Sequence, residues 1–329
     1  YILGEVGFGG CGGGGKIMEN EIITLVENGE VTVSEALSRL RKAYTGTEKA
    51  KQESTPNEKV LAAKKQLDGL IGLHSVKELV HEVQAYVEIQ QRRRQLNLAS
   101  EPVVLHSIFM GNPGTGKTTV ARIIGELFLA MGVLQKGHLV EVERADLVAE
   151  YIGQTAQRTR EQLQKANGGI LFIDEAYSLA RGGTRDFGKE AIDTIVKTME
   201  DQRNNLIVIL AGYPGPMEAF LQTNPGLRSR FPIVIKFPDY STFELFRIAE
   251  QMLKQRDYQL TKAARRKLLR IIEELKKQDT ENFGNARIVR NMVESAIRKQ
   301  AVRLVNISDA SITQLMEITE EDIQEVGDA

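Results

Sequence analysis

Apolar residues recur along the middle of the chain in two alternating patterns. Short runs rich in β-branched and aliphatic residues predict five buried strands, at residues 103–110, 138–143, 170–173, 206–211 and 233–237. Apolar positions three and four residues apart predict helices at residues 75–96, 118–131, 155–166 and 189–202. Strands that alternate with helices indicate an α/β fold with a five-stranded, mainly parallel sheet. Beyond residue 239 the pattern is helical throughout, so a smaller helical domain is expected to follow the sheet.

The first 65 residues do not follow this pattern. Residues 1–17 hold seven glycines between Gly7 and Gly15 and lack the basic and apolar regions of a secretory signal. A run of GGN codons shortly before Met18 is what translation of a ribosome-binding site would produce. We therefore expect Met18 to be the native start and residues 1–17 to be a disordered leader, with a flexible linker as the alternative. Residues 18–65 join short apolar pieces to a polar tract, which predicts a small helical hairpin and a linker.

Composition narrows the class of protein. The chain has 329 residues, 42% hydrophobic and 26% charged, which is ordinary for a globular protein of two or three domains. Lys and Arg (43) balance Asp and Glu (44), so no overall positive field attracts nucleic acid or an anionic membrane. The one cysteine, Cys11, excludes an internal disulfide and suits a reducing compartment. Apolar runs fall far short of the ~20 residues of a membrane span, and we expect a cytoplasmic protein.

One loop carries the pattern of a phosphate-binding site. Residues 111–118 match G-x-x-x-x-G-K-[ST] between a predicted strand and a predicted helix. Its glycines allow close approaches at which successive N–H groups point at phosphate oxygens. Lys117 supplies a charge for the β- and γ-phosphates, and the Thr118 hydroxyl is placed to bind Mg²⁺. The alternative is a glycine turn that only joins strand to helix. We expect ATP and Mg²⁺ to bind here, with the nucleotide held by Gly111, Asn112, Pro113, Gly114, Thr115, Gly116, Lys117, Thr118 and Thr119.

A pair of carboxylates follows the third predicted strand. Asp174 and Glu175 come at the carboxyl edge of a buried strand, where open α/β sheets place their ligands. Asp174 is suited to hold Mg²⁺ through water, and Glu175 to orient and deprotonate the water that attacks ATP. Alone, such a pair is as often structural as catalytic. Downstream of the phosphate loop, it predicts hydrolysis of ATP.

Four motifs occur in order along the chain: GNPGTGKT, ILFIDE, NPGLRSRF and GNARIVRN. With them the chain resembles the AAA+ ATPases, and from about residue 67 to 305 it is similar to the branch of red-type Rubisco activases and stage V sporulation K proteins. The stretches GHLVEVERADLVAEYIGQTA and EAYSLARGGTRDFGKEAIDT are most similar to the sporulation members. The resemblance implies a P-loop α/β core at residues 66–238 and a helical lid with a C-terminal tail at residues 239–329. It also implies a homo-oligomer, expected to be a hexameric ring, that acts on a protein in the mother-cell cytoplasm.

The resemblance implies further residues of the ATP site. Arg230, or Arg228, would be an arginine finger that reaches the γ-phosphate of a neighbouring subunit, and Arg287 would be the sensor-2 arginine of the lid. A surface ion pair for Arg228 or Arg230 and a solvated helix face for Arg287 are the structural alternatives. Three residues fall where such proteins pack against adenine: Leu70, Ile71 and Gly72.

Two tyrosines are open to more than one interpretation. By resemblance, Tyr151, Ile152 and Gly153 form a substrate-contacting loop that faces the central pore of a ring, whereas sequence alone favours packing of Tyr151 on its own domain. Tyr213 stands where many relatives carry the polar sensor-1 Asn. Its phenol is able to bond to water or phosphate, and a packing role fits equally well.

The function predicted from these features is a Mg-ATP-dependent ring motor that remodels or threads a protein partner, in the manner of a sporulation factor. A Rubisco-activase-like remodeller is the alternative within this class. A clamp-loader or helicase-loader ATPase would share the same ATP-site residues, but the balanced charge and the lack of a basic face with aromatic residues argue against a nucleic-acid partner. A nucleotide-gated scaffold that does no work on a substrate is a third class.

Overall fold

The structure is a computed structural model that describes residues 56–100, 103–151, 153–181, 187–202, 205–278 and 283–324. The chain divides into two compact units, Tyr1–Thr55 and Pro56–Ala329, and the described residues all belong to the second. The predicted leader, the native start at Met18 and the helical hairpin lie outside the described residues.

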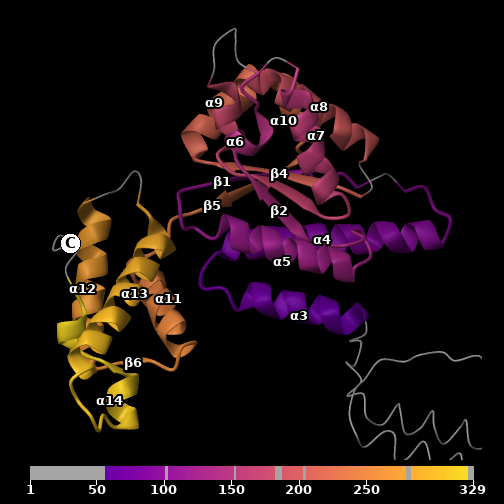
Figure 1. The fold of residues 1–329 in the computed structure, drawn as a ribbon. Helices are drawn as coiled ribbons and strands as arrows, with labels where there is room; N and C mark the ends of the chain where they lie inside the picture. The colour runs from indigo at the N-terminus through magenta and orange to yellow at the C-terminus, as the bar shows by residue number, and fades with distance from the viewer. Residues whose placement is uncertain are drawn as a thin grey trace, which may run out of the picture. The chain divides into compact units, whose positions relative to one another are not determined.

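Five parallel strands form the central sheet of this unit (Figure 1). They are β1 (Ser107–Gly111), β2 (Leu139–Val142), β3 (Ile170–Ile173), β4 (Ile207–Gly212) and β5 (Ile233–Phe237), in the order β2-β3-β4-β1-β5. All four strand pairings are parallel, which confirms the predicted five-stranded α/β sheet. β1 begins later than the strand predicted from residue 103, because Leu105 and His106 are buried but precede the pairing with β4 and β5.

Helices cover both faces of the sheet (Figure 1). One face carries α3 (Pro56–Asp68), α4 (His74–Gln95) and α5 (Lys117–Ala130). The other carries α6 (Arg144–Leu147), α7 (Thr155–Ala166), η1 (Ala176–Ala180), α8 (Gly188–Asp201), α9 (Pro214–Thr223) and α10 (Pro225–Arg228). Side chains of a strand alternate between the faces, so Phe109 joins the first core while Ile108 and Met110 join the second. Burial on both faces explains why the strands read as continuous apolar runs.

Helix α3 begins inside the stretch interpreted as a linker. Proline fits the first turn of a helix, since its missing N–H has no partner there, and Pro56 is the first residue of α3. Ala63 and Leu67 are buried where α3 packs against α5. The α/β core therefore extends further toward the N-terminus than residue 66.

The lid follows β5 and consists mostly of helices. They are α11 (Thr242–Lys254), α12 (Lys262–Gln278), α13 (Asn285–Leu304), α14 (Ile312–Met316) and the short η2 (Glu320–Asp322). The prediction of a wholly helical lid is wrong in one respect, because β6 (Gln259–Leu260) and β7 (Glu317–Ile318) form a parallel pair. Strands of two residues are too short to leave an alternating pattern in the sequence. The side chain of Gln300 in α13 fixes the segment that leads into β7, because its amide donates to the carbonyls of Gln314, Leu315 and Glu317.

Among the described residues, no helix combines the length and apolar character that crossing a membrane requires.

Candidate functional site

The loop between β1 and α5 has the backbone of a phosphate-binding turn. Gly114 (φ 69°) and Gly116 (φ 95°) lie in the left-handed region that favours glycine. A Cβ at Gly111 would lie 2.6 Å from the Phe237 carbonyl oxygen, so that position is also closed to larger residues. The loop ends at Lys117, the first residue of α5, where unpaired N–H groups and the helix dipole favour an anion.

Lys117 occupies this loop with its ammonium bonded to the backbone. Nζ donates to the carbonyl oxygens of Gly111 and Asn112, each at 2.9 Å. Burial lowers the pKa of Lys117; the charge of Asp174 opposes this shift and that of Arg287 adds to it. Both acceptors are neutral carbonyls, so a phosphate oxygen would be a stronger partner for the same ammonium.

A cavity of about 350 Å³ opens over the loop at the carboxyl ends of the strands. It brings together the following predicted site residues: Gly111, Pro113, Gly114, Gly116, Lys117, Thr118, Thr119, Asp174, Glu175 and Arg287. Also in its lining are Glu141, Gly212, Tyr213, Ala286 and Arg290. The phosphate loop, three other strand ends and the lid helix α13 thus contribute to one cavity.

The two carboxylates differ in exposure and backbone. Asp174 is partly buried, and its Oδ1 accepts from the Glu175 N–H at 2.9 Å. Glu175 is exposed and has φ 45°, which is uncommon for a residue other than glycine. This turn directs Glu175 away from the line of β3 at the mouth of the cavity, where a carboxylate is able to meet water.

Tyr213 takes the packing role that was one of its two interpretations. It lines the cavity, and its ring packs on that of Tyr177 with centroids 6.1 Å apart. Arg181 covers the Tyr177 ring at 4.8 Å. Burial, then the charge of Glu175 and a hydrogen bond with it, raise the pKa of Tyr177 to about 12, so its phenol stays protonated.

The two candidate finger arginines do not join this cavity. Arg230 Nη2 lies 2.7 Å from Glu200 Oε1, and Nη1 donates to the Gly226 carbonyl at 2.8 Å. Arg228 is exposed. Both precede β5, whose last residue, Phe237, pairs with Gly111 of the phosphate loop. At about 3.3 Å per residue, the four steps from Ile233 to Phe237 span ~13 Å, and Arg230 precedes Ile233 by a further three residues.

The segment expected at adenine lies beside the loop but outside the cavity lining. Leu70 packs partly against the core, and Ile71 lines a separate cavity of about 740 Å³ next to α11. Gly72 has φ 65°, and a Cβ there would meet Glu244. Its neighbour Leu73, with φ 56°, comes closer to the phosphate loop, with Cδ1 3.6 Å from the position of a Cβ on Gly116.

Tyr151 and Gly153 of the predicted pore loop are exposed to solvent. Tyr151 is 67% exposed, so it does not belong to the described core. Gly153 has φ 80°, and a Cβ there would meet nothing within 4 Å. Ile152 lies outside the described residues.

Asp239 and Tyr240 are residues at the site that sequence reasoning missed. Asn112 Nδ2 donates to Asp239 Oδ2 at 3.0 Å, and the Tyr240 hydroxyl donates to the Thr115 carbonyl at 3.2 Å. Their position after the last predicted strand was a usable signal. The strand that pairs with β1 must end beside the phosphate loop, so the residues that follow it meet that loop.

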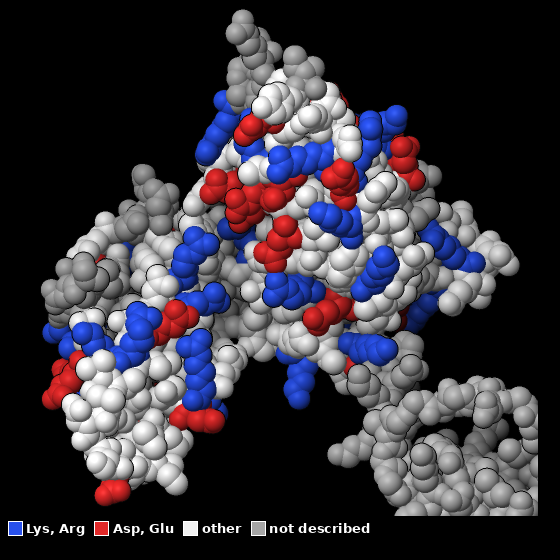
Figure 2. Space-filling view, viewed as in Figure 1, with Lys and Arg blue, Asp and Glu red and all other residues white. Residues whose placement is uncertain are grey.

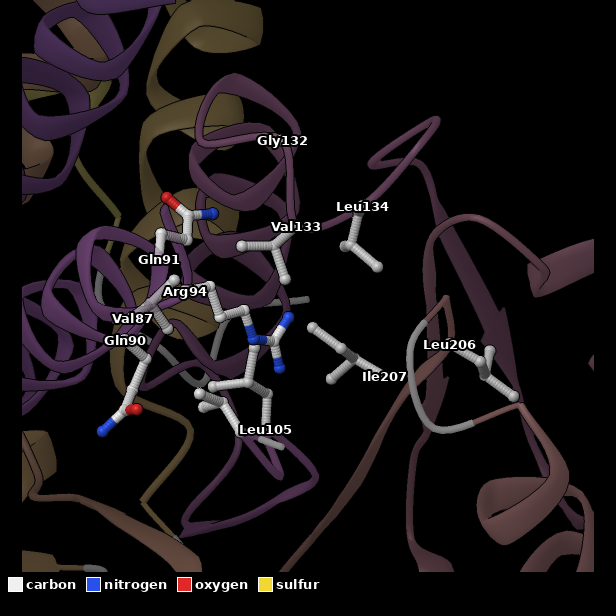
Figure 3. A pocket seen from close by; sticks show the side chains of 11 residues that line it. Val87, Gln90, Gln91, Arg94, Leu105, Gly132, Val133, Leu134, Leu206 and Ile207 are labelled. Atoms are coloured by element: carbon white, nitrogen blue, oxygen red, sulfur yellow. The ribbon is translucent and has the colours of Figure 1, made fainter. Parts of the chain in front are cut away.

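A third cavity, of about 320 Å³, lies near the amino-end segments of the sheet (Figure 3). Leu105, Val133, Leu134 and Ile207 form apolar walls, and Arg94 of α4 points between them. Among the described residues of the lining, Arg94 is the charged one, so this cavity has no acid–base pair and is not the site of the chemistry.

Comparison with known proteins agrees with this geometry. The model of the ATPase family associated with various cellular activities (AAA) matches residues 107–239, and the AAA lid domain matches residues 241–328. Stage V sporulation protein K of Bacillus subtilis (strain 168) is 52% identical over 260 residues, which are 79% of this chain and 81% of that protein.

Two other similarities are informative. The chloroplastic ribulose bisphosphate carboxylase/oxygenase activase of Cyanidioschyzon merolae is 43% identical over 77% of this chain and 87% of its own. A mutant of Thermotoga maritima RuvB has a TM-score of 0.52 at 20% identity, over 78% of this chain and 69% of its own, which shows a shared fold. From the family match and the extent of these relatives, the chain belongs to the AAA ATPases and is a nucleotide-binding enzyme that hydrolyses ATP.

Proposed function

We propose that this protein is a Mg-ATP-dependent motor that assembles into a ring, expected to be hexameric, and remodels or threads a protein partner. The observation that carries the proposal is the separation between Arg230 and the cavity. An arginine at the amino end of β5 is too far from its own phosphate loop to act there. It would act on the nucleotide of a second copy, with Arg228 as the nearby alternative.

Each group in the cavity has a chemistry that fits the proposal. The Thr118 hydroxyl and the Asp174 carboxylate are oxygen ligands of the kind that Mg²⁺ prefers, and Lys117 lines the same cavity with its ammonium bonded to the Gly111 and Asn112 carbonyls. Bound Mg²⁺ would neutralise charge on the phosphates. Glu175 would take the proton of the attacking water, and Arg287 would contact the γ-phosphate from the lid. Leu70, Ile71 and Gly72 would pack near adenine.

We further propose that the partner is a protein contacted by Tyr151, Ile152 and Gly153, and that the pathway is the spore maturation of a stage V sporulation protein K, in the mother-cell cytoplasm. The support is the 52% identity with that protein. The Rubisco activase relative, at 43%, supports a second candidate. Stimulation of ATP hydrolysis by a sugar phosphate would favour the activase.

The charge distribution disfavours a nucleic-acid machine. On the face drawn in Figure 2, Lys and Arg alternate with Asp and Glu over the described surface, and no basic stripe runs across it. A phosphate backbone is held by clustered positive charge, and its binding weakens steeply with salt. Filter binding to DNA at increasing salt concentrations tests this: tight binding that weakens steeply with salt would indicate a nucleic-acid partner.

The test is ATPase activity and sizing of one sample, with and without ATP·Mg. At ATP ~100-fold above Kd, binding should stabilise the fold by about 2.7 kcal/mol, or a few degrees in Tm. Lys117→Ala should lose this shift and the activity, while Lys262→Ala, at an exposed lysine of α12, should keep both. If neither the Tm nor the oligomeric size of the wild-type protein changes with ATP·Mg, the proposed motor function is wrong.

A further inference from the structure

Asn285, the first residue of α13, joins three separate parts of the chain. It is fully buried and has φ 45°. Its Oδ1 accepts from the Tyr240 N–H at 3.0 Å. Its Nδ2 is shared among Asp239 Oδ1 (2.7 Å), the Phe283 carbonyl (2.8 Å) and the Pro113 carbonyl (3.3 Å). One amide therefore bonds to the phosphate loop, to the segment after β5 and to the lid.

Other contacts make the same connection along the loop. Asp239 accepts from Asn112 as well as from Asn285. The Ala286 N–H donates to the Gly114 carbonyl at 3.2 Å, and a Cβ on Gly114 would lie 2.7 Å from the Arg287 nitrogen. With the Tyr240 bond to Thr115, each of the four residues from Asn112 to Thr115 bonds either to the segment after β5 or to the first turn of α13.

The first turn of α13 also carries Arg287, which lines the nucleotide cavity. Arg287 follows Asn285 by two residues within the same helix, so the two backbones move together. Bound phosphates that displace Pro113 or Gly114 would move the carbonyls to which Asn285 and Ala286 donate, and the start of α13 would move with them.

We propose that Asn285 is a positioning residue that couples the phosphate loop to the lid: its amide sets where Arg287 stands over the nucleotide and passes a displacement of the loop to α13. The inference rests on the proposed ATP chemistry of this cavity. It adds the route by which binding at the loop would reach the lid.

The residue type is well matched to this task. Asparagine tolerates the left-handed conformation better than most residues, and it offers both a donor and an acceptor. Aspartate would keep the shape, lose the donors and bring a second carboxylate against Asp239. Glycine would keep the backbone angle but lose every side-chain bond.

The test is a double-mutant cycle on steady-state ATPase with Asn285→Asp, Arg287→Ala and the two combined. We expect Asn285→Asp to raise KM for ATP about tenfold and to lower kcat about tenfold, and Arg287→Ala to do much the same. If Asn285 acts through Arg287, the combined variant is within about twofold of Arg287→Ala alone. A residue that only supported the fold would give losses that multiply.

The matched control is Asn97→Asp. Asn97 is also an asparagine in the left-handed region (φ 54°), but it is exposed at the end of α4, and its variant should keep wild-type kinetics. If Asn285→Asp does not fold, Asn285→Gly enters the same cycle. In this variant the amide hydrogen of Ala286 should also exchange at least tenfold faster than in the wild type, because its bond to Gly114 is no longer supported.

The outcomes separate the two proposals. A wild type that binds no ATP overturns the proposed function. An active wild type whose Asn285 variants hydrolyse ATP normally, or lose activity independently of Arg287, overturns the coupling and leaves the motor intact.

Discussion

At the carboxyl end of the sheet charged side chains face a cavity, whereas at the amino end a histidine is enclosed and neutral. Lys117 and Asp174 are partly buried and Glu175 is exposed, and the Lys117 ammonium donates to two neutral carbonyls. His106, before β1, is 4% exposed, and burial lowers its pKa to about 4. Its Nδ1 accepts from the Val208 N–H at 3.0 Å, and Met199 supplies a backbone partner. The charged side chains at the carboxyl end can therefore exchange their present partners for a ligand, whereas the His106 imidazole is held by its buried hydrogen bonds.

We expect the largest effect from Arg230. This residue precedes the amino end of β5, yet its proposed target is the nucleotide of a neighbouring subunit. We expect Arg230→Ala to keep ATP binding and to lose roughly 10³-fold in hydrolysis, the lower end for an arginine finger. Mixing it with Lys117→Ala should restore some activity, since some interfaces then pair an intact finger with an intact loop. Turnover of the mixture is the measurement.

The control for Arg230 addresses its ion pair with Glu200. Glu200→Gln should hydrolyse ATP within about twofold of the wild type, since an exposed pair contributes little to stability. Equal losses in Glu200→Gln and Arg230→Ala would make the arginine a structural partner of α8 and remove it from the site.

Glu175→Gln tests the carboxyl end directly. The Mg²⁺ and phosphate contacts remain while the water loses its base, so kcat should fall ~10²-fold or more with ATP affinity preserved. The variant should also hold an ATP-assembled oligomer longest. Glu218→Gln, exposed on α9, is the matched control. Single-turnover ATPase and size-exclusion chromatography with ATP would measure both effects, and normal turnover would rule out Glu175 as the base.

His106 should affect stability and not rate. Its pKa is about 4 in the folded state and 6.5 unfolded, so the unfolded chain binds more protons between these values. The free energy of unfolding should therefore fall as pH drops from 6.5 to 4, by about 3 kcal/mol at full effect.

His106→Gln, whose amide oxygen could still accept from Val208, should remove this contribution. Urea unfolding at several pH values would compare the two slopes. At pH 7.5 both proteins should hydrolyse ATP at the same rate. Parallel slopes would mean that another group governs acid sensitivity.

Sequence patterns could predict the features that depend on neighbours in the chain. The phosphate loop lies within eight residues and the carboxylate pair within two, so strand, turn and helix signals place them at the right edge of the sheet. The contact between Asn285 and Asp239 spans 46 residues, and the pairing of β6 with β7 joins even more distant segments. Such contacts depend on how the helices of the lid pack in three dimensions. Neither the residue types nor the apolar periodicity of the sequence predicts that packing.

Replacing Tyr151 should change the ATPase rate least, because this residue lies outside the nucleotide cavity. The loop that holds it follows β2 and α6, yet Tyr151 is 67% exposed and does not line the cavity. An exposed tyrosine offers a large contact surface at low entropy cost, which suits a partner of varied sequence. Tyr151→Ala should therefore melt within a degree of the wild type and hydrolyse ATP within about twofold, while work on the protein partner is abolished. Tyr86→Ala, at another exposed tyrosine on α4, is the control and should keep both activities. ATPase and remodelling measured on the same preparation decide the matter, because normal remodelling by Tyr151→Ala would remove this loop from substrate contact.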